Sequence, residues 1–183
     1  MAKVAVLMIE GYEEGETLTI VDLLRRAGIA CHTFYFNEPF VKGMHNMYVK
    51  ADKLFSDEVK DYDMLVLPGG RPGGANLKNN PDVIAMVKYF NENNKYLAAM
   101  CSGTTVLADA KVIDGKKVTG YTGYQEKLIG GNFVEDVVVF DQNIVTSQGP
   151  ATPYPFAFKI AEVFGKDVTE MKERLMYNFA GGK

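Results

Sequence analysis

One cysteine stands at a junction of the kind that supports nucleophilic chemistry. The segment Ala99-Met-Cys-Ser-Gly103 joins an apolar stretch, typical of a buried strand, to an apolar helical stretch. A strand, a sharp turn carrying the nucleophile and a helix, with small residues two positions before and after, form a nucleophile elbow. Cys101 occupies the nucleophile position, and the free N–H groups at the start of the next helix favour a thiolate. The pattern predicts a reactive thiol, although free cysteines also end ordinary core strands.

A second loop with chemical potential is rich in glycine. Pro68-Gly-Gly-Arg-Pro-Gly-Gly74 follows the apolar run Met64 to Leu67. It lacks the Gly-Lys-Ser/Thr of a phosphate-binding loop and the acid on the next strand that a dinucleotide fingerprint needs. By itself it indicates a flexible turn as readily as a binding loop. A tyrosine-phosphatase loop is excluded as well, because the position six residues after Cys101 holds Leu107 rather than Arg.

The elements that must position these loops alternate between strands and helices. Strands are predicted at Lys3 to Ile9, Ile29 to Phe36, Tyr48 to Ala51, Met64 to Leu67, Tyr96 to Met100, Val137 to Phe140 and Ile144 to Ser147. Helices are predicted at Glu16 to Ala27, Pro81 to Asn91, Thr104 to Ala110, Pro153 to Phe164 and Val168 to Asn178, with an irregular stretch from Asn37 to Met47. This alternation predicts one α/β domain over residues 1–183. The expected architecture is a flavodoxin-like three-layer α/β/α sandwich, with a mostly parallel sheet and a small antiparallel hairpin.

Three loops are expected to meet at one edge of that sheet. Ligands of such folds bind outside the carboxyl ends of the parallel strands. Glu16, the glycine pair Gly69 and Gly70, and Cys101 each follow a predicted strand. The topology therefore predicts that these residues converge on one site.

Composition narrows the function classes. The chain has 183 residues, 47% of them hydrophobic, and a net charge of −3 with Lys and Arg scattered along it, which disfavours a nucleic-acid surface. The longest apolar runs have six residues, too few to cross a membrane, and no signal peptide is recognisable. Two cysteines and two histidines are too few for a disulfide framework or a structural zinc site, so we expect no metal. A reducing cytoplasmic location is expected.

The sequence resembles the ThiJ/PfpI family of the class I glutamine-amidotransferase-like superfamily, and its deglycase-type branch in particular. Four motifs carry the resemblance in the family's order: Gly11-Tyr-Glu-Glu-Gly-Glu-Thr17, Val66-Leu-Pro-Gly-Gly70, Leu97-Ala-Ala-Met-Cys-Ser-Gly103 and Thr146-Ser-Gln-Gly-Pro150. The resemblance implies that Cys101 is the reactive thiol and that Glu16 is a partly buried carboxyl touching its sulfur. It also implies that Gly70 and Ser102 donate backbone N–H groups, and that no cofactor is needed. Glu13 and Glu14 are expected to be solvated acids near the helix dipole.

The chain departs from the family at the histidines. Ser102 stands where some members carry His directly after the cysteine, and Tyr121 stands where deglycase-like members usually have His. An ordinary phenol, with a pKa near 10, is not a base at neutral pH. His32 lies in a predicted strand, where a structural role is expected. His45 lies in the segment that crosses to the neighbouring subunit in dimeric members, so we hypothesise that it approaches the partner's Cys101.

Four functions are compatible with the sequence. The first is an oxidant- or electrophile-responsive protein in which Cys101 is oxidised to a sulfinate. The second is a cofactor-independent glyoxalase III or deglycase-like activity on 2-oxoaldehydes, slow for want of a nearby His. The third is a cysteine peptidase, which ranks last because no base adjoins the thiol. The fourth is a non-catalytic, chaperone-like dimer. The resemblance implies a homodimer.

Overall fold

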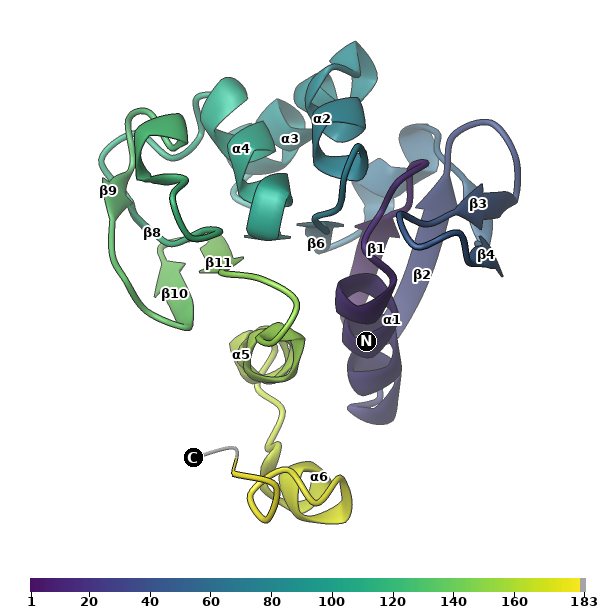
Figure 1. The fold of residues 1–183 in the computed structure, drawn as a ribbon, viewed down its shortest axis with the longest axis vertical. Coiled ribbons are helices and arrows are strands. Elements are labelled where there is room, and N and C mark those ends of the chain that lie inside the picture. Colours follow the sequence, from purple (N-terminus) through teal and green to yellow (C-terminus); the bar gives the residue numbers. More distant parts are fainter. Residues whose placement is uncertain (182–183) are drawn as a thin grey trace.

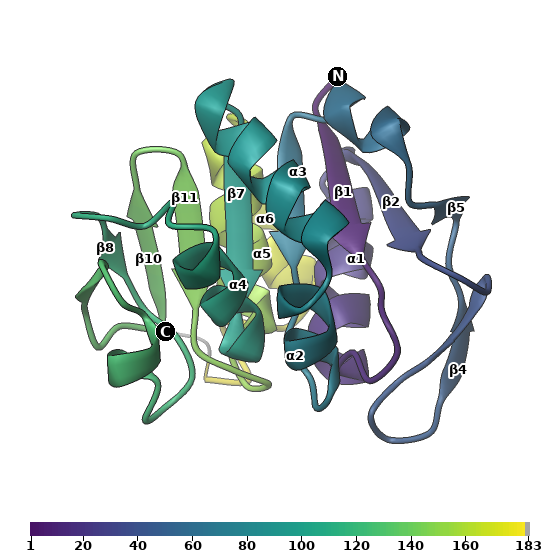
Figure 2. The same cartoon turned by 90° about the horizontal axis from the view of Figure 1, so that it is seen from above.

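The centre of the computed structural model, which describes residues 1–181, is a seven-stranded sheet in the order β10-β11-β7-β6-β1-β2-β5. All neighbours are parallel except the β10–β11 hairpin. Figure 2 shows the hairpin at one end of the sheet and β5 at the other. The strands are β1 (Lys3–Leu7), β2 (Ala30–Tyr35), β5 (Lys53–Leu54), β6 (Met64–Leu67), β7 (Tyr96–Met100), β10 (Val138–Asp141) and β11 (Ile144–Ser147).

Helices cover both faces of this sheet because its central strands bury side chains on both sides. Every residue of β6 is buried, as expected for a strand in a parallel sheet with two covered faces. Helices α2 (Gly73–Lys78), α3 (Pro81–Glu92) and α4 (Thr104–Asp109) cover one face, and α1 (Glu14–Arg26) and α5 (Pro153–Val163) cover the other, with α6 (Thr169–Arg174) lying beyond α5 (Figure 1). The predicted three-layer sandwich is therefore confirmed.

Two separate hydrophobic cores fill the space between the layers. On one side, Leu65 and Leu97 pack with α3 and α4, and on the other Val4 and Val66 pack with α1 and α5. Neighbouring residues of one strand enter opposite cores because successive side chains point to opposite faces. The cores hold the strand ends, and the loops that follow them, in fixed positions.

Several predicted boundaries shift. Helix α1 begins at Glu14 rather than Glu16, because Glu13 caps it by accepting a hydrogen bond from the Glu16 amide. The glycine loop ends in an additional helix, α2. The last helix, α6, ends at Arg174, short of the predicted Asn178.

Small sheets occupy two stretches where the sequence gives little periodicity. The predicted irregular segment contains β3 (Phe40–Lys42), which forms an antiparallel pair with β4 (Tyr48–Lys50). Strands β8 (Lys117–Val118) and β9 (Asn132–Phe133) pair in parallel beside the main sheet. Short 3₁₀ helices span Asp57–Asp61, Cys101–Gly103 and Gln125–Lys127.

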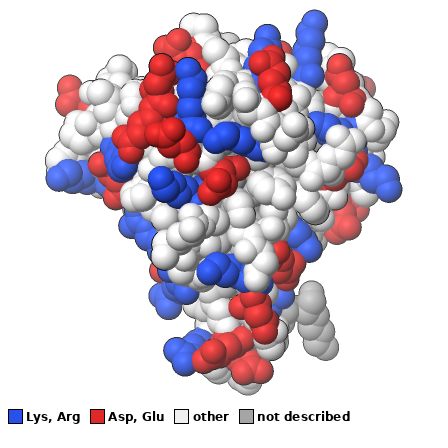
Figure 3. All heavy atoms as spheres, turned by 180° about the vertical axis from the view of Figure 1, so that it is seen from behind, with Lys and Arg blue, Asp and Glu red and all other residues white. Residues whose placement is uncertain are grey.

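The surface and the helices bear on two further expectations. In the face drawn in Figure 3, basic and acidic side chains are interspersed rather than gathered into a basic stripe. Within residues 1–181, every helix is too short or too polar to span a bilayer.

Candidate functional site

Cys101 lies at the carboxyl end of β7, where the chain turns sharply into α4. Its φ of 53° is unusual for a non-glycine residue and is the strained turn that an elbow requires. Gly103 permits the turn, because a Cβ there would lie 2.2 Å from the Leu67 carbonyl oxygen. The half-buried thiol is thus presented at the predicted strand–helix junction.

Glu16 reaches the same point from the first turn of α1. Its side chain is fully buried, and Oε2 accepts a hydrogen bond of 2.8 Å from the Gly69 amide. A Cβ at Gly69 would lie 2.7 Å from Glu16 Oε2 and 2.9 Å from Cys101 Sγ, so only glycine leaves room for both groups. Glu16 Oε1 has no N or O partner among the described residues, which is a poor environment for a carboxylate.

The ionisation of Glu16 and Cys101 is coupled. Burial raises the pKa of Glu16 to about 7, against the lowering effects of the Gly69 amide and the thiol. Burial also raises the pKa of the Cys101 thiol to about 12, and the negative charge of an ionised Glu16 adds to the effect. Because each anion disfavours the other, the pair retains one proton near neutral pH. The thiolate is available when Glu16 holds that proton.

The predicted effect of the helix start on the thiol is present, but it is not the largest effect on the thiol pKa. The two backbone amides of Ser102 and Gly70 do lower the thiol pKa, as the implied donor role requires. Desolvation and the facing carboxylate outweigh them. Ser102 is fixed by its hydroxyl, which donates a hydrogen bond of 3.0 Å to the Gly70 carbonyl.

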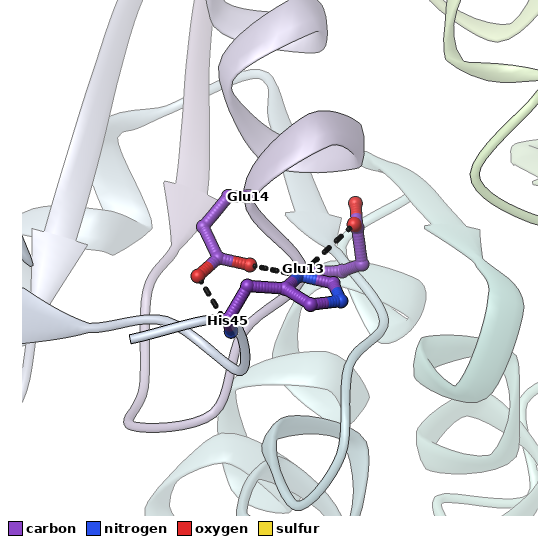
Figure 4. Close-up of side chains that lie close together, drawn as sticks. All are labelled: Glu13, Glu14 and His45. Atoms are coloured by element: carbon purple, nitrogen blue, oxygen red, sulfur yellow. Dashed lines mark hydrogen bonds and ion pairs between the residues drawn. The ribbon is translucent and has the colours of Figure 1, made fainter. Parts of the chain in front are cut away.

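Glu13 and Glu14 are buried, which corrects the expectation of solvated acids. Glu13 caps α1, and Glu14 is only 1% exposed. The loop between β3 and β4 folds over them, and His45 contacts Glu14 twice: its amide donates to Oε1 at 2.8 Å and its Nδ1 lies 2.8 Å from Oε2 (Figure 4). Burial acts to raise the pKa of Glu14, but hydrogen bonds from the backbone and from the His45 ring hold it below its ordinary value.

A cavity of about 280 Å³ opens onto the thiol. Its walls combine charged, aromatic and small residues: Glu13, Met44, His45, Gly70, Arg71, Cys101, Ser102, Tyr121, Tyr124 and Pro150. His45 thus lies at the Cys101 cavity of its own chain, and the hypothesis that it approaches the partner's Cys101 stays a prediction. Tyr121 forms an edge-to-face pair with Tyr124.

The other histidine lies outside this cavity. His32 is on β2, with Nδ1 2.9 Å from the Tyr62 hydroxyl. A larger hollow of about 570 Å³, between β3, α2 and the end of β1, contains neither cysteine nor histidine. Size therefore does not decide the location of the site, and we assign it to the cavity of Cys101.

Glu13, Glu14 and His45 also have ligand atoms within 4.8 Å of one another, close enough for a metal ion. These atoms already make hydrogen bonds within the protein. Nδ1 of His45 is paired with Glu14, and the Glu13 carboxylate accepts a hydrogen bond from the Glu16 amide at the start of α1. Protein hydrogen bonds thus account for the cluster.

These observations define a flavodoxin-like fold with a cysteine at a nucleophile elbow and a buried carboxyl beside it. Residues 2–163 match the DJ-1/PfpI family, and the chain belongs to that family. It is 35% identical over 178 residues to protein dj-1beta of Drosophila melanogaster, covering 93% of this chain and 95% of the fly protein. The crystal structure of Drosophila melanogaster DJ-1beta aligns with a TM-score of 0.90 at 32% identity, over 96% of this chain and 97% of that one.

A further relative carries an activity in its name. The glutathione-independent glyoxalase DJ-1 of Schizosaccharomyces pombe is 29% identical over 180 residues, covering 91% of this chain and 94% of the yeast protein.

Sequence reasoning missed part of the cavity wall. Arg71, Met44, Tyr124 and Pro150 line it without having been singled out. Arg71 lies inside the glycine loop and Pro150 ends the fourth family motif, so both belong to segments that the sequence already indicates as parts of the site. No local pattern indicates the pairing of Glu14 with His45.

Proposed function

We propose that this chain is an oxidant-responsive protein whose sensing group is Cys101. The observation that carries the proposal is the pairing of a half-buried thiol with the buried Glu16 carboxyl, whose pKa is raised to about 7. Near neutral pH a protonated Glu16 can donate a hydrogen bond to an oxidised sulfur. The amides of Gly70 and Ser102 add two donors.

The proposed chemistry uses a hydroperoxide as oxidant. The thiolate attacks one peroxide oxygen, the O–O bond breaks, and the sulfenic acid forms as hydroxide leaves. A second peroxide oxidises the sulfenate to the sulfinate and is itself reduced to water. Glu16 and the two amides stabilise the resulting negative oxygens.

The test is intact-mass analysis of the Cys31→Ser protein after mild hydrogen peroxide treatment. We expect a gain equal to two oxygen atoms, and none in the matched Cys31→Ser/Cys101→Ala protein. The Glu16→Gln substitution should slow the conversion of the Cys101 sulfenate to the sulfinate. Complete resistance of Cys101 to the oxidant would refute the proposal.

A second candidate is the conversion of a 2-oxoaldehyde to a 2-hydroxy acid. The observation that favours it is the presence of His45 in the wall of the Cys101 cavity, because neither position 102 nor position 121 provides a histidine. The cavity volume, about 280 Å³, is at the lower end for ligand pockets and suits a small substrate. The named activity of the yeast relative supports the same reaction class.

The corresponding test follows methylglyoxal consumption and lactate formation. Wild type should exceed the Cys101→Ala protein, without added glutathione or metal. Equal rates for the two proteins would remove this candidate.

A homodimer remains a proposal as well. Phe40, Met47 and Tyr48, on the hairpin beside the cavity, are 59%, 51% and 63% exposed, and such clustered apolar side chains often mark an interface. Light scattering at micromolar concentration tests the proposal, and a monomer mass would refute it.

A further inference from the structure

We infer that His45 is the proton-transfer residue of the Cys101 cavity in its own chain, and that Glu14 positions its ring. The inference rests on the second proposed function, conversion of a 2-oxoaldehyde. It supplies the base that neither the residue after Cys101 nor position 121 provides.

The loop carrying His45 is fixed by backbone contacts to the start of α1. The Met44 amide donates to the carbonyl of Tyr12, just before α1, at 2.9 Å, and within the loop the Gly43 amide donates to the Met47 carbonyl at 2.8 Å. A Cβ on Gly43 would lie 2.2 Å from Glu14 Oε1, so glycine is required for the loop to approach this closely. His45 is therefore held relative to Glu14 by its main chain as well as by its ring.

The contact with Glu14 sets the tautomer of the ring. Glu14 is buried and its pKa is held below the ordinary value, so it is a carboxylate and can only accept hydrogen bonds. Nδ1 of His45 must then carry a proton, which leaves the lone pair of the neutral ring on Nε2. Figure 4 shows the second ring nitrogen pointing away from Glu14. Within residues 1–181, Nε2 has no hydrogen-bond partner.

The surroundings suit a base that acts on a ligand. The His45 side chain is 58% exposed, so substrate can reach it. Glu13 Oε1 lies 3.8 Å from Nδ1, on the same side of the ring as Glu14. Arg71 is the other charged residue of the cavity wall. Because the cavity is small, a molecule bonded to Cys101 remains next to the wall that contains His45.

The geometry gives each residue one part of a balanced reaction. The Cys101 thiolate adds to the aldehyde carbon, and the carbonyl oxygen takes the proton held by Glu16. His45 Nε2 removes the hydrogen of that carbon as a proton, and the hydroxyl proton moves to the neighbouring oxygen, giving an enediolate. The Nε2 proton then returns to the second carbon and a thioester forms. Water hydrolyses the thioester to the 2-hydroxy acid, and the thiol proton returns to Glu16. No oxidant is consumed.

The experiment compares wild type, His45→Gln and Glu14→Gln with methylglyoxal, and uses His32→Gln as the matched control. General-base catalysis contributes roughly 10²- to 10⁴-fold, so we expect kcat of His45→Gln to fall at least about 100-fold, with a smaller fall for Glu14→Gln. The rate of Cys101 alkylation by iodoacetamide should be unchanged. His32→Gln should match wild type.

A second readout separates proton transfer from a structural role. With methylglyoxal deuterated at the aldehyde carbon, the isotope effect on kcat should be larger for His45→Gln, because proton removal becomes slower. If wild type forms lactate and His45→Gln matches it, the assignment of His45 is overturned while the proposed activity stands. If His45→Gln also loses alkylation of Cys101, its role is structural and the assignment is again overturned. A wild type no faster than Cys101→Ala overturns both.

Discussion

The buried Glu16 carboxyl makes the stability of this protein depend on pH in a defined direction. Burial raises its pKa from the ordinary 4.5 to about 7, whereas in the unfolded chain the group is solvated. A group whose folded pKa is raised gives its full stabilisation below the unfolded pKa and loses it as pH rises through the folded pKa. The relevant window therefore runs from about 4.5 to about 7 and slightly above.

The size of the effect follows from the same values. A rise from 4.5 to about 7, at about 1.4 kcal/mol per pKa unit, corresponds to about 3 kcal/mol. Glutamine at position 16 keeps an acceptor for the Gly69 amide and does not ionise. The free energy of unfolding of wild type, relative to Glu16→Gln, should therefore fall by about 3 kcal/mol between pH 4.5 and pH 8.

The assay is urea unfolding of both proteins at matched concentration across this pH range. Taking the difference between the two curves cancels the contributions of the other titrating groups to the free energy of unfolding. These groups include His32, whose pKa is lowered mainly by burial. Because the pKa of the Cys101 thiol is raised to about 12, the Cys101–Glu16 pair as a whole loses only one proton in this window. A flat difference between wild type and Glu16→Gln would refute the reasoning about the site.

Three further predictions test the packing around the site. Gly69→Ala should destabilise the fold by about 1–3 kcal/mol in urea unfolding and slow the alkylation of Cys101. The reason is that the added Cβ would meet the Cys101 and Glu16 side chains. An unchanged rate of alkylation would contradict this geometry. Cys31 is 3% exposed, and its pKa is raised to about 12, mainly by burial. In the Cys101→Ala protein, a thiol reagent at pH 8 should therefore label no cysteine until urea is added. Leu65→Ala should cost about 3 kcal/mol in urea unfolding, because this fully buried side chain leaves a cavity between β6 and its covering helices; a cost below about 1 kcal/mol would show that the core collapses around the gap.

Much of the fold could be predicted because its signals are local. The run Met64–Leu67 is apolar throughout, and that is sufficient to place a strand buried on both faces. The short strands β3 and β8 escaped prediction, since two or three residues carry no periodicity and their pairing partners lie elsewhere in the chain. The early start of α1 depends on the Glu13 cap, a contact between side chain and backbone that a count of apolar residues cannot register.

For the site, the sequence determined which residues meet, and the tertiary structure decided their chemical state. Cys101, Glu16 and Gly69 each follow a strand, and parallel strands bring their carboxyl ends to one edge whatever the details of packing. The ionisation of Cys101 depends instead on how far the thiol is buried and on the charge of Glu16 beside it. Glu14 and His45 are 31 residues apart, and only the folding of the β3–β4 loop over α1 brings them together. Proximity across such a distance is set by packing, so it cannot be derived from residue types and spacing alone.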